Sequence, residues 1–443
     1  MRRHFGFLKF SRVMIAVMVS LFVAQEKIGA AKCPCDIYKD GGTPCVAAHS
    51  TVRALYESFN GPLYQVRLKS DTTKKKDIYP LTPGGYANAK AVDSFLNGTS
   101  GGTVSKIYDQ SEKKNDLTVS LTGSAHPAPL RETPATRFKD TISGHIVYPL
   151  LTDTCEGYRN NHTNGVATGA QLEGMYCVVR GGPHMKKTAD QSDCCWDYGN
   201  AESDASSAGK KTGVMEALYF GSNCWFSPCK GNGPWFFADL EWGLFHGAAD
   251  STIPYKYAAG YLKGDVKTYT VRTADATKTV LPNLGATNRP APNILTGAII
   301  LGIGGDSAPS GWGYFFEGAM TIGRPPDTTE DAVHKNIAYV YSGKDIVEVN
   351  MAATKSPVPR FGTRYNPSTG SAVISYVLQD AAQISIAILD QRGRLVAAIA
   401  NGVRSAGMNK AIWNPGRVPA GVYIWKLAID GRDGGAGKIV VGK

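Results

Sequence analysis

The sequence lacks the features of several common protein classes. Beyond residue 24, no stretch approaches the roughly 20 consecutive apolar residues of a membrane-spanning helix, so we expect no transmembrane segment. It has no Gly-x-Ser-x-Gly motif, which argues against a serine hydrolase of that type. A glycine-rich stretch at 302–305 follows an apolar run, but the third glycine of a dinucleotide-binding fingerprint is replaced by Ser307. Cys33 and Cys35 lack a second pair of cysteines or histidines, and the sequence therefore predicts no metal site and no cofactor.

Positive charge is scarce where a nucleic-acid enzyme would need it. The formal net charge is +11, of which +4 lies in residues 1–30 and +8 in residues 355–443, so the long segment between them carries −1. Proteins that bind nucleic acids place lysine and arginine on the functional domain to neutralise phosphates. We therefore expect no nucleic-acid partner, and the basic tail is typical of a solvated surface.

The first 30 residues have the pattern of a secretory signal peptide. Four basic residues precede an apolar run at 13–24, and small residues follow at 29–31. We expect the mature chain to begin at Ala31 or Lys32 and to be secreted, in the medium or at the cell surface. All nine cysteines lie after this segment, and an oxidising compartment permits disulfides.

The remaining sequence divides into two β-rich parts. Residues 354–370 are rich in proline, serine, threonine and glycine, which predicts a linker between a domain at 31–353 and one at 371–443. The second part alternates apolar and polar residues in short runs, which predicts a small β-sandwich. These runs are 372–379, 383–389, 395–400, 421–429 and 438–441.

The larger part has many glycines, short apolar runs and little helical periodicity, which predicts a large β-sandwich or jelly roll. Expected strands include 174–179, 217–220, 234–238 and 297–302. One helix is expected near 47–58 and another near 329–341.

Two adjacent cysteines, Cys194 and Cys195, stand out in this part. Neighbouring Cα atoms lie about 3.8 Å apart, less than the roughly 4.4–6.8 Å of a relaxed disulfide, so a bond between them would strain the backbone. Such strain is usually kept where it serves a site. From the dipeptide alone, a bond between them and separate partners elsewhere are both open.

Seven blocks between residues 33 and 345 resemble the catalytic domain of family 54 glycoside hydrolases, which are retaining α-L-arabinofuranosidases. The first is CPCDIYKDGGTPCVAAHSTVRALYESFNGPLYQVRLKSD at 33–71, and the others are IYDQS, GYRNN, CCWDYGNAE, MEALYFG, GPWFFADLE and GAIILGIGGD. The resemblance implies an all-β catalytic domain of the concanavalin-like β-sandwich, or jelly-roll, kind.

The resemblance also implies the catalytic pair. Retention requires one carboxylate that attacks the anomeric carbon and one carboxyl group that protonates the leaving oxygen, about 5–5.5 Å apart. The family pattern makes Glu241, at the end of ADLE, the nucleophile and Asp306, at the end of GIGGD, the general acid and base. Asp306 would need a raised pKa to begin protonated.

The same resemblance implies a sugar-binding set around the pair. Bonded to each other, Cys194 and Cys195 would form an apolar floor for the C–H face of the arabinofuranose, and Trp225 would form an aromatic wall. Asp239 lies two residues before Glu241 and, on an extended strand, shares its face. The remaining candidates are the backbone of Gly305 and Trp242, which replaces the family's asparagine at the pocket rim.

The family pattern and the tail give further expectations. Cys35 and Cys45 keep the spacing of the family's first disulfide, and the pairings Cys224–Cys229 and Cys155–Cys177 would leave Cys33 unpaired. The C-terminal part resembles small immunoglobulin-like domains of exported bacterial proteins, some of which are secretion or sorting signals. A spacer and a carbohydrate-binding module stay open as alternatives.

The expected activity is removal of terminal α-L-arabinofuranosyl groups from arabinose-containing plant polysaccharides such as arabinoxylan or arabinan. One alternative is a lectin-like sandwich that binds furanose without turnover. Another is a related furanosidase, such as a galactofuranosidase. Secretion machinery or a cell-surface attachment would be the partner of the C-terminal domain.

Overall fold

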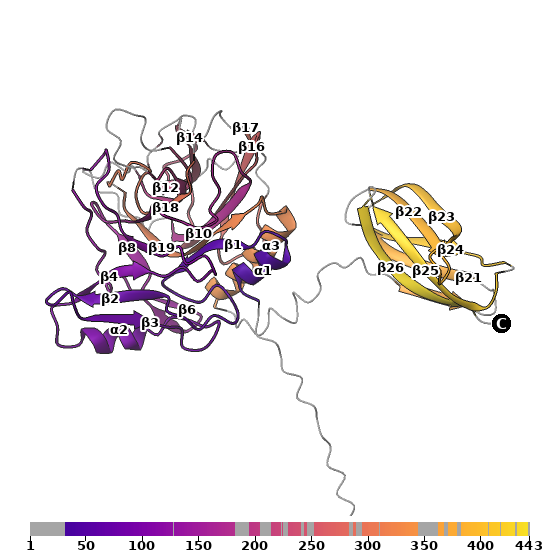
Figure 1. Cartoon of the computed structure of the whole chain (residues 1–443), viewed down its shortest axis with the longest axis horizontal. Coiled ribbons are helices and arrows are strands. Elements are labelled where there is room, and N and C mark those ends of the chain that lie inside the picture. Colours follow the sequence, from indigo (N-terminus) through magenta and orange to yellow (C-terminus); the bar gives the residue numbers. More distant parts are fainter. Residues whose placement is uncertain are drawn as a thin grey trace, which may run out of the picture. The chain divides into compact units, whose positions relative to one another are not determined.

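The computed structural model describes residues 32–126, 128–181, 195–203, 214–222, 224, 229–240, 243–245, 252–282, 287–288, 295–309, 311–343, 362–366, 371–378, 382–405, 407–416, 418–429 and 432–441. The chain forms two compact units, Met1–Val347 and Glu348–Lys443. Each contains antiparallel sheets with a hydrophobic core of its own (Figure 1). In the described part, no helix is long and apolar enough to cross a membrane.

Two large antiparallel sheets form the first unit. The seven-stranded sheet has the order β1 (Cys45–Ser50), β19 (Gly313–Ile322), β10 (Glu173–Arg180), β15 (Tyr257–Gly264), β16 (Thr268–Asp275) and β17 (Thr287–Asn288), with β8 (Leu150–Thr152) also paired to β19. The ten-stranded sheet has the order β14 (Gly243–Phe245), β13 (Trp235–Leu240), β12 (Met215–Gly221), β11 (Asp197–Ala201), β18 (Ala298–Leu301), β9 (Tyr158–Asn160), β5 (Leu117–Val119), β4 (Gly102–Ile107), β2 (Tyr64–Leu68) and β3 (Lys75–Ile78). A hairpin of β6 (Asp140–Ile142) and β7 (His145–Val147) completes the strands described here.

Alternation along the strands builds the layers. In β10, Cys177 and Val179 belong to the core between the two sheets, whereas Tyr176 and Val178 belong to the core on the other face. That second core is covered by the helices α1 (Pro34–Asp40) and α3 (Asp327–Tyr341), while α2 (Ala89–Leu96) packs near β3. The result is the β-sandwich that the sequence predicts, with helices on the outer face of the seven-stranded sheet.

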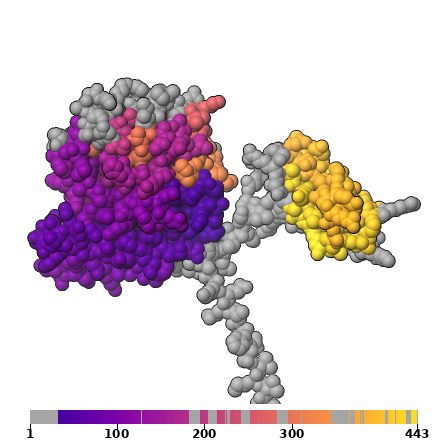
Figure 2. Space-filling model, viewed as in Figure 1, coloured from indigo at the N-terminus to yellow at the C-terminus, as the bar shows by residue number. Residues whose placement is uncertain are grey.

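The strands at one end of the ten-stranded sheet come from the middle of the chain. Figure 2 shows the first third of the chain, in indigo and purple, covering one end of the first unit, and later segments, in magenta and orange, at the other. Strands β11, β12, β13 and β18 lie side by side at this second end. They carry the CCWDYGNAE, MEALYFG, GPWFFADLE and GAIILGIGGD blocks.

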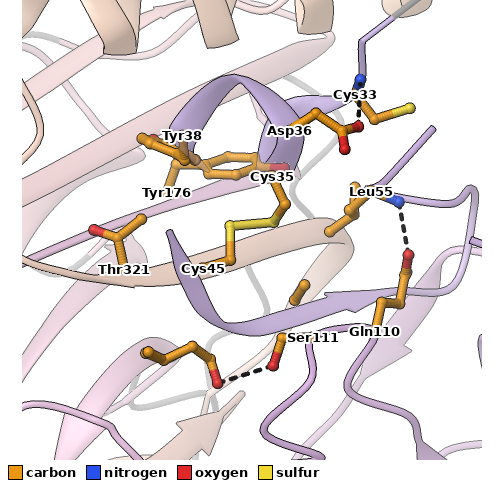
Figure 3. Close-up of a disulfide and its surroundings, with 12 residues drawn as sticks. Cys33, Cys35, Asp36, Tyr38, Cys45, Leu55, Gln110, Ser111, Tyr176 and Thr321 are labelled. Carbon is orange, nitrogen blue, oxygen red and sulfur yellow. Dashed lines mark hydrogen bonds between the residues drawn. A yellow bond between two sulfur atoms is a disulfide. The ribbon is translucent and has the colours of Figure 1, made fainter. Parts of the chain in front are cut away.

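The N-terminal helix is joined to the first strand by a disulfide between Cys35 and Cys45, whose Cα atoms are 5.6 Å apart (Figure 3). A second disulfide joins Cys224 to Cys229. The expected Cys155–Cys177 pairing is wrong, because both are free cysteines. Cys177 is fully buried in the core between the sheets, whereas Cys155 packs against a separate cluster beside β18, so the two thiols belong to different parts of the fold.

The helix expected at 329–341 is confirmed as α3, but the one expected at 47–58 is wrong. Cys45–Ser50 pairs with β19 as strand β1, and the chain then turns. The hydroxyl oxygen of Ser50 accepts hydrogen bonds from the backbone N–H groups of Val52 and Arg53, at 3.1 and 3.0 Å. Serine that binds the backbone in this way competes with helix formation.

A buried ion pair fixes this turn to the sheet. The guanidinium group of Arg53 donates two hydrogen bonds of 2.6 Å to the carboxylate of Glu317 on β19. It also donates to Asn336 of α3 at 2.9 Å. Both charged side chains are almost fully buried, so their pairing connects the turn, the sheet and the helix in the core.

The second unit is a small β-sandwich around one core. A three-stranded sheet has the order β20 (Gly362–Asn366), β21 (Ser371–Leu378), β24 (Gly407–Trp413), and a four-stranded sheet has β23 (Leu395–Arg404), β22 (Ala382–Leu389), β25 (Gly421–Ile429), β26 (Arg432–Val441). Ile384, Ile386 and Ile388 alternate into the core, where Trp425 is also buried. Strands β20 and β24 were not expected from the sequence.

Candidate active site

Asp239 lies near the end of β13, on the outer face of the ten-stranded sheet. Its neighbours Ala238 and Leu240 belong to the core between the sheets, so its side chain points the other way. In register it pairs with Ala217 of β12, which pairs with Gly199 of β11. On the β12 side of Asp239, the residues in this row are therefore small, whereas on the other side Asp239 pairs with Leu244 of β14.

The Asp239 side chain is 7% exposed. Burial, together with the charge of Asp306, raises the pKa of its carboxyl group to about 7. A carboxyl group in this position takes up a proton far more readily than a surface aspartate.

Asp306 lies in the turn that follows β18. The Gly302 N–H donates to the backbone oxygen of Asp197 at 2.8 Å, which continues the pairing of β18 with β11. The Ala308 N–H donates to Oδ1 of Asp306 at 3.0 Å and fixes the direction of the carboxyl group. Burial raises the pKa of Asp306, while the bond from Ala308 and the charge of Arg159 oppose that rise. The group is therefore held toward its protonated form, as a proton donor requires.

Arg159 of β9 fixes this turn through hydrogen bonds. Its guanidinium Nη1 donates to the backbone oxygen of Gly305 at 2.5 Å. The same group also donates to the backbone oxygen of Glu202 and to the side chain of Asn161. Arg159 thus connects the residue before Asp306 to two other segments of the site.

Cys195 is buried next to the Asp306 turn and is disulfide-bonded. The next residue, Trp196, points into the core between the sheets and donates from Nε1 to Thr152 at 2.9 Å. Because successive side chains of an extended segment point to opposite faces, the sulfur of Cys195 lies on the outer face of the ten-stranded sheet, as the Asp239 side chain does.

Sequence reasoning missed a third aspartate, Asp197, at the start of β11. One of its carboxylate oxygens, one of Asp239 and the Cys195 sulfur all lie within 4.8 Å of one another. Such a trio resembles a metal-ligand set, but the sulfur of Cys195 is in a disulfide and is not available as a thiolate ligand. The available signal was its position two residues after Cys195, which gives it the same face of an extended strand.

The structure therefore brings Cys195, Asp239, Gly305 and Asp306 together at one end of the ten-stranded sheet. The other expected site residues, Cys194, Trp225, Glu241 and Trp242, lie outside the described residues. Their roles, and the separation of the two catalytic carboxyl groups, remain predictions.

A depression of about 280 Å³ opens beside the Asp306 turn. Its lining is mostly polar: Asp116, Thr118, Val119, Ser120, Leu121, Thr122, Arg159, Asn160, Asn161 and His162. Two of these residues touch the turn itself. Arg159 binds Gly305, and the hydroxyl groups of Ser120 and Ser307 are 3.1 Å apart. The depression on strands β5 and β9 is thus adjacent to the turn that carries Asp306.

Comparison with known proteins identifies the family. The model of the alpha-L-arabinofuranosidase B catalytic domain matches residues 34–342. A probable alpha-L-arabinofuranosidase B of Aspergillus fumigatus is 40% identical over 385 residues, covering 80% of this chain and 72% of that protein. The chain belongs to this family of α-L-arabinofuranosidases.

Further arabinofuranosidases agree in sequence and in structure. Alpha-L-arabinofuranosidase B of Emericella nidulans is 39% identical over 399 residues, with 85% of this chain and 76% of that protein covered. An arabinofuranosidase complexed with arabinofuranosyl-alpha-1,2-xylobiose has a TM-score of 0.63 and 33% identity, covering 84% of this chain and 74% of that one. A GH54 enzyme soaked with a cyclic sulfate inhibitor has a TM-score of 0.63 and 36% identity, with 79% and 73% covered. The chain is a glycoside hydrolase of this type, as its sequence blocks predict.

Proposed function

We propose that this arabinofuranosidase removes single terminal α-L-arabinofuranosyl groups with retention of configuration. The observation that carries this proposal is the convergence of the Asp306 turn with the β13 strand end that immediately precedes Glu241. Asp306 has a raised pKa from burial, and Asp239, two residues before Glu241, faces the disulfide-bonded Cys195.

The reaction proceeds in two displacements. In the first, the Glu241 carboxylate bonds to the anomeric carbon as the bond to the leaving oxygen breaks, and Asp306 gives that oxygen its proton. In the second, Asp306 takes a proton from water as the water oxygen bonds to the anomeric carbon and releases Glu241. Arabinose and the shortened polymer leave, and both acids return to their starting forms.

The remaining residues of the set bind the sugar. The disulfide of Cys194 and Cys195 supports the C–H face, and Trp225 closes the pocket as an aromatic wall. Asp239 accepts hydrogen bonds from sugar hydroxyl groups, and the backbone of Gly305 contributes to the same ring of contacts. Trp242, which stands in place of the family's asparagine, narrows the pocket rim and offers the sugar no polar contact there. We infer no metal and no cofactor in the reaction.

The leaving group occupies the depression beside Asp306. A proton donor must face the leaving oxygen, and two residues that line the depression, Arg159 and Ser120, hydrogen-bond to the turn that carries Asp306. Its hydroxyl, amide and imidazole groups suit the hydroxyl groups of a xylose or arabinose backbone. A similar arabinofuranosidase has been solved with arabinofuranosyl-alpha-1,2-xylobiose. We therefore propose arabinoxylan or arabinan side groups as substrates of this chain.

The test compares aryl α-L-arabinofuranoside with the matching β-D-galactofuranoside. The wild type should release aglycone from the arabinofuranoside, whereas Glu241→Gln and Asp306→Asn should lose most of the activity. The exposed Glu112 offers a matched control, since Glu112→Gln should remain fully active. Binding of the sugar without release would favour the lectin alternative, and preference for galactofuranoside would favour the related furanosidase. Proton NMR of the first product should show the α-anomer of arabinofuranose, and a β-anomer would refute retention.

We also propose that the protein is exported, with residues 1–30 as the signal peptide and mature residues from 31 onward. The disulfides Cys35–Cys45 and Cys224–Cys229 are consistent with an oxidising destination. The catalytic domain would span 31–353. The sequence places the linker at 354–370 and the immunoglobulin-like domain at 371–443, but β20 (Gly362–Asn366) pairs with β21, so we propose that the linker ends before Gly362 and that the domain includes β20.

For the C-terminal domain we propose a role in secretion or attachment to the cell surface. Its strands form an independent sandwich, and residues 355–443 carry a net charge of +8. Deleting residues 355–443 should leave activity on aryl arabinofuranoside intact and abolish export or surface retention in the native host. Normal export with loss of binding to insoluble arabinoxylan would instead indicate a carbohydrate-binding module. If the deletion changes neither export nor binding to insoluble arabinoxylan, the domain is a spacer.

A further inference from the structure

Asp197 is the one fully buried carboxyl group in the described part of the site. It is 0% exposed, and neither carboxylate oxygen has a hydrogen-bond partner among the described residues. Burying an ionised carboxylate without a partner costs several kcal/mol or more, whereas burying the neutral acid costs far less. The group therefore needs a proton, a partner, or both.

The surroundings of Asp197 determine which of these it has. Two acids face it on the outer side of the sheet, Asp239 of β13 and Asp306 of the turn after β18, and both disfavour its ionised form. On the inner side the thiol of Cys177 of β10 lies within electrostatic range. No basic group of the described residues contributes to its charge balance. Two negative charges this close together would be unfavourable, so one of the two carboxyl groups holds a proton. That group is Asp197, because it is more deeply buried than Asp239.

Asp239 is the partner within reach. One of its carboxylate oxygens lies within 4.8 Å of one of the Asp197 oxygens. A rotation about the side-chain bonds of either aspartate can shorten this gap, and catalytic hydrogen bonds are often long before substrate binds. A carboxylate has about four lone-pair sites, so Asp239 can accept from Asp197 and from sugar hydroxyl groups together.

We propose that Asp197 is a positioning residue that stays protonated and donates its O–H to Asp239 when the sugar binds. In the sugar complex, the donated O–H orients Asp239 and favours its ionised form, which accepts hydrogen bonds from the arabinofuranosyl hydroxyl groups. Asp197 touches neither the anomeric carbon nor the leaving oxygen, so it acts through Asp239. The role of Asp239 as the sugar ligand belongs to the function proposed above, and this inference depends on it.

Two substitutions separate the neutral donor from a charged group. Asp197→Asn is nearly isosteric with the protonated acid and retains an N–H donor. It should keep kcat/KM on aryl arabinofuranoside within about threefold, with both limbs of the pH profile unmoved. Asp197→Ala removes the donor to a charged group, which corresponds to a loss of roughly tenfold or more in kcat/KM. Most of that loss should appear in KM, because Asp239 binds the sugar in the ground state.

A spectroscopic measurement is independent of activity and of the alanine variant's folding. The infrared difference spectrum of wild type minus Asp197→Asn at neutral pH should contain the carbonyl stretch of a protonated carboxylic acid. Absence of that band overturns the inference. Three other outcomes also overturn it. These are an Asp197→Asn variant as impaired as Asp239→Asn, a shifted limb in the pH profile of Asp197→Asn, and a folded Asp197→Ala variant that keeps the wild-type kcat/KM. If the wild type does not cleave arabinofuranosides, the proposed function fails while the band still reports the proton.

Discussion

Replacing Arg159 with methionine should impair proton donation by Asp306 more than it impairs sugar binding. The guanidinium group of Arg159 holds the backbone oxygen of Gly305, one residue before Asp306, and also ties down Glu202 and Asn161. Methionine fills a similar volume but donates no hydrogen bond. The turn would then be held mainly by its own backbone bonds and by Ser307.

The magnitude follows from these contacts. A hydrogen bond from a charged donor contributes about 1.5–3 kcal/mol. A displacement of about 1 Å in a catalytic group costs on the order of 100-fold in rate, or about 2.7 kcal/mol. We therefore expect kcat/KM on an arabinofuranosyl xylo-oligosaccharide to fall roughly 100-fold. A 4-nitrophenyl arabinofuranoside should be affected less, because its leaving group requires little protonation.

The pH profile gives a second readout. The positive charge of Arg159 lowers the pKa of Asp306, so its removal should raise that pKa further. Since Asp306 must be protonated for the first displacement, the alkaline limb of kcat/KM should move to higher pH. Arg159→Lys is the matched control, because it keeps the charge but not the planar donor group, and its limb should stay in place.

The assay is a pH series of kcat/KM on both substrates for wild type, Arg159→Met and Arg159→Lys, with thermal unfolding to verify the fold. Equal losses on the two substrates, together with an unmoved alkaline limb in the methionine variant, would refute the positioning of Asp306 by Arg159.

Three further predictions concern stability. Arg53→Met leaves Glu317 charged in the core and should lower the free energy of unfolding in urea by about 3–5 kcal/mol. The double variant Arg53→Met with Glu317→Leu should recover most of this loss. An unchanged urea midpoint in the single variant would contradict the buried pair. Because the pKa of Asp239 is raised, the folded state binds more protons than the unfolded state between pH about 4 and about 7. As the pH rises through this window, the free energy of unfolding of the wild type should fall relative to that of Asp239→Asn. Parallel curves of unfolding free energy against pH would argue against the raised pKa. Cys35→Ser with Cys45→Ser opens a loop of sequence separation 10 and should cost about 2–4 kcal/mol, which a thermal melt equal to wild type would disprove.

Local patterns predicted much of the fold because most strands carry their own signal. The apolar run at 174–179 lies within β10 and the run at 234–238 overlaps β13 from residue 235, and both strands are buried on both faces. Strand β24 was missed because Asn409 and Lys410 have weak strand propensity, and pairing with β21 determines its conformation. The helix expected at 47–58 failed for the same reason, since Cys45–Ser50 pairs with β19 as strand β1.

The site was predictable only where a family pattern marks the residue. Asp239 and Asp306 stand in blocks that resemble the family, and no periodicity distinguishes them from other acids. Asp197 has no such mark, and what singles it out is its complete burial beside another carboxyl group. Burial of this kind depends on strands that are distant in sequence, and composition does not reveal it. The same limit explains the incorrect Cys155–Cys177 pairing, because spacing along the chain does not say which layer holds a thiol.

The glycines of the GIGGD block illustrate how packing and chemistry are linked in this site. A Cβ atom on Gly304 would lie 3.3 Å from Oδ1 of Asp306 and 3.5 Å from Cβ of Cys195. One on Gly311 would lie 2.2 Å from the backbone oxygen of Cys195, which no side chain can tolerate. The backbone at position 311 can therefore approach the backbone of Cys195 this closely only because that position lacks a side chain, whereas a Cβ at position 304 would be in ordinary contact with Cβ of Cys195. Gly311, five residues after Asp306, thus brings the segment that carries the proton donor close to the cysteine on which the sugar is proposed to rest.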